Sequence, residues 1–248
     1  MTDDGFIRRS HEPFHTTRWS IVLSAGERSG GTDAARALAE LCQMYWAPLY
    51  AYLRRTGASP GDAEDLVQGF FAQLLARDDL KRVEPERGRF RSFLLASLKH
   101  YAANERDRQR AQKRGGGRTI LRLEIADAEH RIQNEPAHEE TADVLFDRQW
   151  ALTLLERVRS RLRQESVKAG KGVLFEALEA YLTGEARAPK YADAAGTLGM
   201  SEAAVKMAVC RLRQKFGQRL REEIAHTVAS ANDVEDEIRG LLAALQAR

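Results

Sequence analysis

The hydrophobic and polar positions of this chain repeat with the period of an α-helix along most of its length. In residues 38–53 the apolar side chains recur three or four positions apart, which places them on one stripe of a helix. These residues are Leu38, Leu41, Cys42, Tyr45, Trp46, Leu49, Tyr50 and Leu53. Pro48 lies within the stripe and is expected to kink or interrupt the helix. Because no segment shows the alternation of a half-buried strand, the sequence predicts an all-α fold.

Two further helices are predicted in the first half of the chain. Gly57 favours the end of the preceding helix, Ser59 is a good N-cap residue, and Pro60 is favoured at the first position of the next helix. The residues expected to face inward from this helix are Leu66, Val67, Phe70, Leu74 and Leu75. After a polar turn, a third helix is expected to continue to about residue 114, with Phe90, Phe93, Leu94, Leu98 and Tyr101 inward.

The second half of the chain predicts another small helical core. Apolar positions indicate helices over residues 145–162 and 173–182, then a short helix over 191–198. Gly199 would make a turn and Ser201 would cap the next helix, which is the pattern of a helix-turn-helix. The inward residues of that last helix are expected to be Val205, Val209, Leu212 and Phe216.

The outer face of this last helix carries candidate DNA contacts. Its members are Ala203, Lys206, Met207, Cys210, Arg211 and Gln214. Such a face suits a recognition helix in a major groove about 12 Å wide. An ordinary αα-hairpin would share the glycine turn and the apolar spacing, but the additional basic residues Arg213 and Lys215 favour DNA.

Charge is distributed in three blocks that the net charge of +3 conceals. Residues 87–114 hold nine basic residues against two acidic ones, and residues 201–221 hold six against one. Between them, residues 123–147 hold eight acidic residues and one arginine. Basic stripes of this kind favour phosphate polyanions through counterion release, although a solvated helix face is the alternative. The pattern therefore indicates DNA held at two places.

Composition excludes several classes of function. No run of about 18 apolar residues and no signal peptide is present. Membrane insertion and export are therefore not expected, and a cytoplasmic location is predicted. Cys42 and Cys210 are isolated, which supports neither a disulfide framework nor a metal site. Gly115 to Gly117 lack the Lys-Ser/Thr that follows in a phosphate-binding loop, and they indicate a hinge. Neither a cofactor nor catalytic activity is predicted, because no nucleophile with a paired base is visible.

These patterns predict two small helical domains joined by a flexible acidic linker. Residues 1–33 would be an N-terminal extension, 34–114 the first domain, 115–142 the linker, and 143–224 the helix-turn-helix domain. Residues 225–248 carry an amphipathic pattern with Val234, Ile238, Leu241, Leu242 and Leu245 on it. This tail would be either a regulatory arm or a helix that packs on the second domain.

The chain resembles the extracytoplasmic-function (ECF) type sigma factors, alternative sigma subunits of bacterial RNA polymerase in the sigma-70 family. Residues 45–50 (YWAPLY) resemble the opening helix of sigma domain 2, and residues 62–68 (DAEDLVQ) are similar to the acidic motif that docks on the polymerase clamp. Residues 90–94 (FRSFL) resemble the start of the promoter-melting helix. Residues 191–206 resemble sigma domain 4.

The resemblance implies roles for particular residues. Asp62, Glu64, Asp65 and Gln68 would contact core RNA polymerase, although these acids also suit a helix N-terminus. The loop at 81–91 would capture a flipped promoter base. Promoter DNA would be contacted in the first domain by Arg89, Arg91, Lys99, His100, Asn104, Arg108 and Arg110. In the second domain the contacts would be Ser201, Lys206, Met207, Arg211, Arg213 and Lys215. An anti-sigma or other regulatory partner is possible in such a family.

Two other functions stay open at this stage. A helix-turn-helix repressor or activator that acts without polymerase would explain the second domain and leave the first unused. A metal-dependent hydrolase would use Asp62, Glu64 and Asp65 as ligands. That second alternative is disfavoured, because positions 62 and 65 share a helix face while 64 does not, and no nearby histidine completes the set.

Overall fold

The computed structural model describes residues 32–76, 89–111, 141–182, 188–228, 230 and 232–246. Every regular element in these residues is a helix, and none of them lies in a strand. The prediction of an all-α fold is therefore confirmed. Residues 1–31, 77–88 and 112–140 lie outside the described residues. They include most of the predicted N-terminal extension and most of the predicted acidic linker.

The first three helices follow the sequence pattern closely. They are α2 (Thr32–Arg55), α3 (Pro60–Ala76) and α4 (Phe90–Ala111). Gly57 has a positive φ of 93° at the end of α2, which is a conformation that glycine adopts without steric cost. The hydroxyl of Ser59 accepts a hydrogen bond from the backbone N–H of Asp62 (3.1 Å), so Ser59 caps α3 and Pro60 opens it, as predicted.

Pro48 does not interrupt α2, contrary to one of the two expectations for it. The helix continues through it from Thr32 to Arg55. An interior proline costs a helix about 3 kcal/mol. Here its neighbours Tyr45, Leu49 and Tyr50 are fully buried, so tertiary packing holds the helix across the missing backbone donor.

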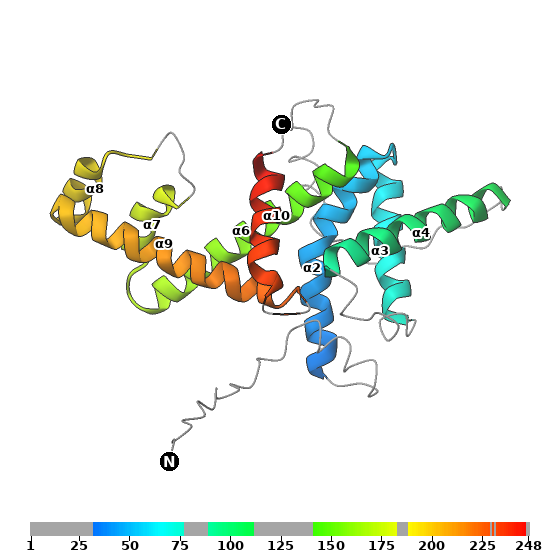
Figure 1. The fold of residues 1–248 in the computed structure, drawn as a ribbon, viewed down its shortest axis with the longest axis horizontal. Helices are drawn as coiled ribbons and strands as arrows, with labels where there is room; N and C mark the ends of the chain where they lie inside the picture. Colours follow the sequence, from blue (N-terminus) through cyan, green and yellow to red (C-terminus); the bar gives the residue numbers. More distant parts are fainter. Residues whose placement is uncertain are drawn as a thin grey trace, which may run out of the picture.

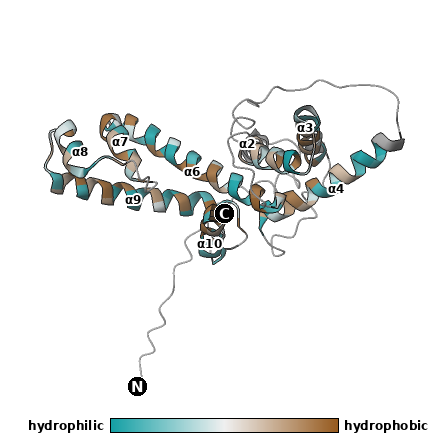
Figure 2. Ribbon diagram, turned by 90° about the horizontal axis from the view of Figure 1, so that it is seen from above, coloured by the Kyte–Doolittle hydropathy of each residue, from teal (hydrophilic) through white to brown (hydrophobic). Residues whose placement is uncertain are grey.

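Two long helices connect the ends of the molecule. The helix α6 (Ala142–Lys168) begins at an N-cap, Thr141, and leads into α7 (Gly172–Leu178) and a short 3-10 turn, η3 (Glu179–Tyr181). The helix α9 (Glu202–Ala225) returns alongside α6. In both views, α2, α3 and α4 lie at one end and α7 and α8 at the other, with α6 and α9 extending between them (Figures 1 and 2).

The short helix, the glycine turn and the capped helix predicted from residue 191 onward all form. The helix α8 (Tyr191–Leu198) ends at Gly199, whose φ of 63° is left-handed. Ser201 is the N-cap of α9, and its hydroxyl accepts a hydrogen bond from the N–H of Ala204 (3.2 Å). A small core lies behind this unit. It contains Leu178, Tyr181, Ala194, Ala195, Val205, Ala208 and Val209.

The main hydrophobic core differs from the predicted division into two domains. The first half of α6 was expected to build the second core, but Phe146, Trp150 and Leu154 are fully buried in the same cluster as α2, α3 and α4. The helical period showed which face of α6 is apolar but did not show which helix would cover it. Only the second half of α6, through Val158 and Leu162, packs toward α7.

The tail forms a helix, α10 (Asp233–Gln246), that packs on α6 and α9. Val234 and Leu241 belong to the main core, and Ile238 and Leu245 pack against it. The tail was expected either to regulate or to pack on the second domain. It packs on α6 and α9, the two long helices of the predicted second domain, which agrees with the packing alternative. It also joins the core that α6 shares with the first domain (Figure 1).

Candidate nucleic-acid interface

Of the first two arginines of the predicted DNA surface, Arg91 is buried and Arg89 is partly exposed. Arg91 is only 6% exposed, and its Nε donates to Oε1 of Glu237 on α10 (2.6 Å). It also pairs with Asp147 of α6 and lies over the ring of Trp150, with its guanidinium carbon 5.0 Å from the ring centroid. Arg89 is half-buried and pairs through Nε with Oε2 of Glu237 (2.7 Å).

These contacts change the electrostatics of Arg91. Burial acts to lower the pKa of its guanidinium, but the hydrogen bonds and charges of Glu237 and Asp147 outweigh burial and raise that pKa. The side chain is therefore a cation held between two carboxylates. In this arrangement Arg91 does not lie on an open surface, and its predicted contact with DNA stays a prediction.

The exposed side of α4 presents the other predicted contacts. His100, Asn104 and Arg108 are exposed and recur every four residues, so they form a row along the helix. The second half of α4 extends beyond the other helices in both views (Figures 1 and 2). Arg108 makes a long pair with Glu105 (3.4 Å). The side chain of Arg110 and the loop at 81–88 lie outside the described residues.

Lys99 is exposed but is not an isolated charge. Its Nζ pairs with Oδ2 of Asp143, in the first turn of α6, at 2.8 Å. It also lies 5.4 Å from the ring centroid of Tyr52. The hydrogen bond to Asp143 raises the pKa of Lys99, so the ammonium is favoured.

The predicted polymerase contacts form two rows on α3. Asp62 and Asp65 are exposed, and the carboxylate of Asp62 accepts the hydroxyl of Ser59 (2.7 Å). Glu64 and Gln68 are half-buried one turn apart, and the Gln68 amide donates to the Glu64 carboxylate (3.0 Å). Asp62 thus serves the helix N-terminus, and both acids also leave a negative charge at the surface.

The outer face of α9 is open along its whole predicted length. All six of its residues are exposed: Ala203, Lys206, Met207, Cys210, Arg211 and Gln214. Met207 is 58% exposed, which is unusual for a large apolar side chain. Lys215 is exposed as well. Among the described residues no acid pairs with Arg211, so this guanidinium is available to an anion.

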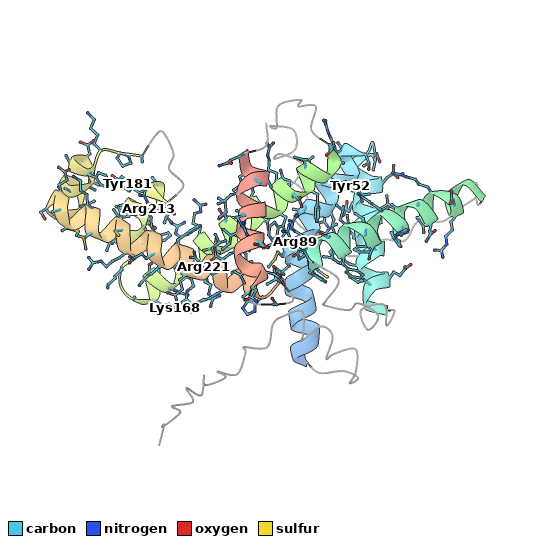
Figure 3. The ribbon with its side chains drawn as sticks, viewed as in Figure 1. Tyr52, Arg89, Lys168, Tyr181, Arg213 and Arg221 are labelled. Carbon is cyan, nitrogen blue, oxygen red and sulfur yellow. The ribbon has the colours of Figure 1, made fainter. Side chains whose placement is uncertain are left out.

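Three other predicted contacts of α9 already have partners. Lys206 pairs with Glu202 (2.7 Å), whose hydrogen bond raises the pKa of that lysine, and Lys206 lies over the ring of Tyr191. Arg213 donates through Nε and Nη2 to the carbonyl of Tyr181 at 3.0 and 2.8 Å (Figure 3). Ser201 is occupied by capping. Arg213 therefore fixes η3 against α9.

Several important residues did not emerge from the sequence patterns. Glu237 is 1% exposed and holds Arg89 and Arg91, while Asp143 and Asp147 pair with cations of α4. The signal for Glu237 was its position within an apolar stripe, three residues after Val234. A charged residue on the buried face of a helix requires a partner of opposite charge. Asp143 and Asp147 were visible only as part of a larger acidic run.

Other classes of site find no support in the described ranges. No group of three or more His, Cys, Asp or Glu side chains there is arranged to hold a metal ion. In the same residues, no helix combines the length and apolar character that a membrane crossing needs.

A family model described as Sigma-70 region 2 matches residues 41–112. The matched segment contains α3, α4 and most of α2, while α6 to α10 lie outside it. No curated protein and no solved structure gives a match. Residues 41–112 are therefore similar to sigma-70 region 2, and this similarity covers less than half of the 248 residues.

Proposed function

We propose that this protein is an alternative sigma factor of the ECF type, which binds core RNA polymerase in the cytoplasm and directs it to a class of promoters. The observation that carries the proposal is the region 2 match over residues 41–112. The role is non-catalytic, because a sigma factor selects DNA for polymerase and performs no chemistry itself. The helix-turn-helix would read a second promoter element.

The exposed carboxylates of α3 would dock on polymerase. Asp62 and Asp65 lie at the surface in the first two turns of the helix, with Glu64 and Gln68 beside them. Charges at the rim of an interface accelerate and orient association more than they add affinity. This role is compatible with the hydrogen bond between Asp62 and Ser59, since a carboxylate can accept several hydrogen bonds.

Promoter DNA would be contacted at both ends of the molecule. On α4, the exposed row of His100, Asn104 and Arg108 suits a single strand, where phosphates meet cations and unstacked bases meet amide or imidazole groups. On α9, Arg211 would read a base edge in the major groove, with Met207 in apolar contact beside it. Lys215 would bind phosphate.

Binding to purified core polymerase tests the docking role. Asp62→Asn combined with Asp65→Asn removes two charges, while the amide oxygen of the new side chain at position 62 could still accept the Ser59 hydroxyl. We expect the association rate at low salt to fall about tenfold, because steering depends on charge. Asp193→Asn is the control, since Asp193 is an exposed acid in the first turn of α8. Equal rates for the double variant and the wild type would contradict the docking role.

A DNA-binding regulator that acts without polymerase is the second candidate. The complete helix-turn-helix with its open outer face favours it. That function predicts duplex binding by the chain and no complex with core polymerase. The same binding measurement therefore separates the two candidates.

A further inference from the structure

The cations at the start of α4 are all paired with acids that are distant in the sequence. The Glu237 carboxylate bridges two guanidinium groups, with Oε1 at 2.6 Å from Nε of Arg91 and Oε2 at 2.7 Å from Nε of Arg89. Asp147 takes the other side of the Arg91 guanidinium. A carboxylate held in this way occupies the place of a phosphate, because guanidinium groups bind both anions with the same geometry.

The pairing continues along α4 toward α6. Residues 91 and 99 are two turns apart on α4, and their partners Asp147 and Asp143 are one turn apart on α6. As the residue number rises on α4 it falls on α6, so the acids follow the row of cations. Three of the cations expected to contact DNA are thereby matched by three carboxylates.

Gly240 shows that α10 is shaped for this contact. A Cβ atom at Gly240 would lie 3.2 Å from Nη1 of Arg89 and 3.4 Å from Nη2 of Arg91. A glycine inside a helix costs about 0.5–1 kcal/mol relative to alanine. Gly240 follows Glu237 by three residues, so both lie on the same face of α10. That face combines an anion for the two arginines with space for them.

We propose that α10 is a latch that closes the DNA-binding surface of α4 in the free protein. In the closed state Glu237, with Asp147 and Asp143 of α6, takes the positions that phosphates of single-stranded promoter DNA would occupy. When the latch opens, Arg89 and Arg91 exchange the Glu237 carboxylate for phosphates. Asp147 and Asp143 stay in place on α6, where phosphates compete with them for Arg91 and Lys99. The proposal rests on the promoter-binding role of α4 proposed above, and it makes the tail a regulatory element of that surface.

The position of α10 in the chain allows it to leave. It is the last described helix, and its 14 residues are too few for a stable isolated helix, so its order depends on packing. Its contribution to the main core is limited to Val234 and Leu241, with Ile238 and Leu245 at the edge. Most of the core that remains is built by α2, α3, α4 and α6.

Single-stranded DNA binding by the full chain tests the latch. Fluorescence anisotropy of a labelled oligothymidylate is measured for the wild type, Glu237→Gln and Asp143→Asn. We expect Glu237→Gln to tighten binding about tenfold, since the apparent affinity rises with the fraction of open molecules. Asp143→Asn should give a smaller gain, by releasing Lys99 alone. The control is Glu235→Gln, which removes one charge from the exposed face of α10 where Glu235 pairs with Arg221.

Hydrogen exchange of the wild-type protein gives a second test, which does not depend on whether a variant folds. Saturating oligothymidylate should reduce the protection of amides in α10 while it protects α4. If Glu237→Gln fails to fold, this measurement decides whether α10 leaves α4, because it uses the wild-type protein.

Two results would overturn the proposal in different ways. If the variants bind no more tightly than Glu235→Gln and α10 keeps its protection with DNA bound, the latch is wrong while the DNA-binding role of α4 stands. If no form of the protein binds the oligonucleotide, both the latch and that role are wrong.

Discussion

The two ends of the molecule carry similar basic helices in opposite surroundings. At the start of α4, Arg89, Arg91 and Lys99 are paired with acids from α6 and α10. On the outer face of α9, Arg211 stays exposed, and Lys206 pairs with Glu202 of its own helix and lies over the ring of Tyr191. The same residue types are therefore paired with distant acids at the start of α4, whereas Arg211 on α9 is exposed. A count of charges along the chain does not reveal which cations are available to DNA.

The hydrophobic cores at the two ends of the molecule differ in size. The core around α2 contains large side chains such as Tyr45, Tyr50 and Trp150, all fully buried. The core behind the helix-turn-helix is small, and three of its seven buried members are alanine. Free energy of local opening follows the amount of buried apolar contact. The helix-turn-helix should therefore open at a lower free energy than the main core.

The largest expected effect tests this difference in cores. Trp150→Ala should reduce the free energy of unfolding by about 3–5 kcal/mol, because a large buried ring is lost and Arg91 loses its aromatic contact. Val205→Ala, at a fully buried position behind the helix-turn-helix, should cost about 1–3 kcal/mol. Urea denaturation measures both. Equal losses would show that the two cores are of equal strength.

The next effect concerns the open surface of α9. Arg211→Ala should weaken discrimination between promoter duplex and random duplex by about 1–3 kcal/mol, if it reads a base edge. Lys206→Ala should have less effect, because its ammonium is shared with Glu202. Competition binding on duplex DNA measures both. An equal loss of affinity for random duplex would show that Arg211 contacts phosphate and reads no base.

Matched N-cap substitutions compare the two ends directly. Ser59→Ala and Ser201→Ala each remove a hydroxyl that accepts from a backbone N–H three residues later, at 3.1 and 3.2 Å. Each should cost about 1 kcal/mol. Because the core behind α9 is small, Ser201→Ala should lower hydrogen-exchange protection mainly in α8 and the start of α9. A uniform loss across all helices would show that the ends unfold as one unit.

The smallest perturbation uses the two cysteines as probes. Burial raises the pKa of the Cys42 thiol to about 11, whereas Cys210 is exposed on the outer face of α9. Since the thiolate is the reactive form, Cys210 should react with a thiol reagent at about pH 8 and Cys42 only after unfolding. Bound promoter duplex should protect Cys210. Fast reaction of both thiols in the native protein would contradict the packing of α2.

Local features of this fold could be predicted from the sequence, and long-range pairings could not. The start of α3 at Pro60, the turn at Gly199 and the cap at Ser201 depend on neighbouring residues alone, and the structure has each where it was expected. Which core the first half of α6 packs in depends on shape complementarity between helices far apart in the chain. Burial of Arg91 depends on Glu237, which follows it by 146 residues.

The candidate site shows the same limit. The outer face of α9 was predicted residue by residue, because the inward stripe of one helix fixes its outward face. The surface of α4 was only partly predicted, since α10 and α6 cover its first turns with acids. A charged residue within an apolar stripe, as at Glu237, is the one sequence signal of such a cover.

Mapping of transcription start sites shows whether this protein directs RNA polymerase to promoters. Core RNA polymerase transcribes fragmented genomic DNA with and without the full-length protein, and the new 5′ ends are sequenced. The account predicts new starts that share two spaced upstream motifs, and Arg211→Ala should reduce their use. The absence of new starts, together with sequence-specific duplex binding by the protein, would contradict the sigma factor and leave a regulator that acts without polymerase.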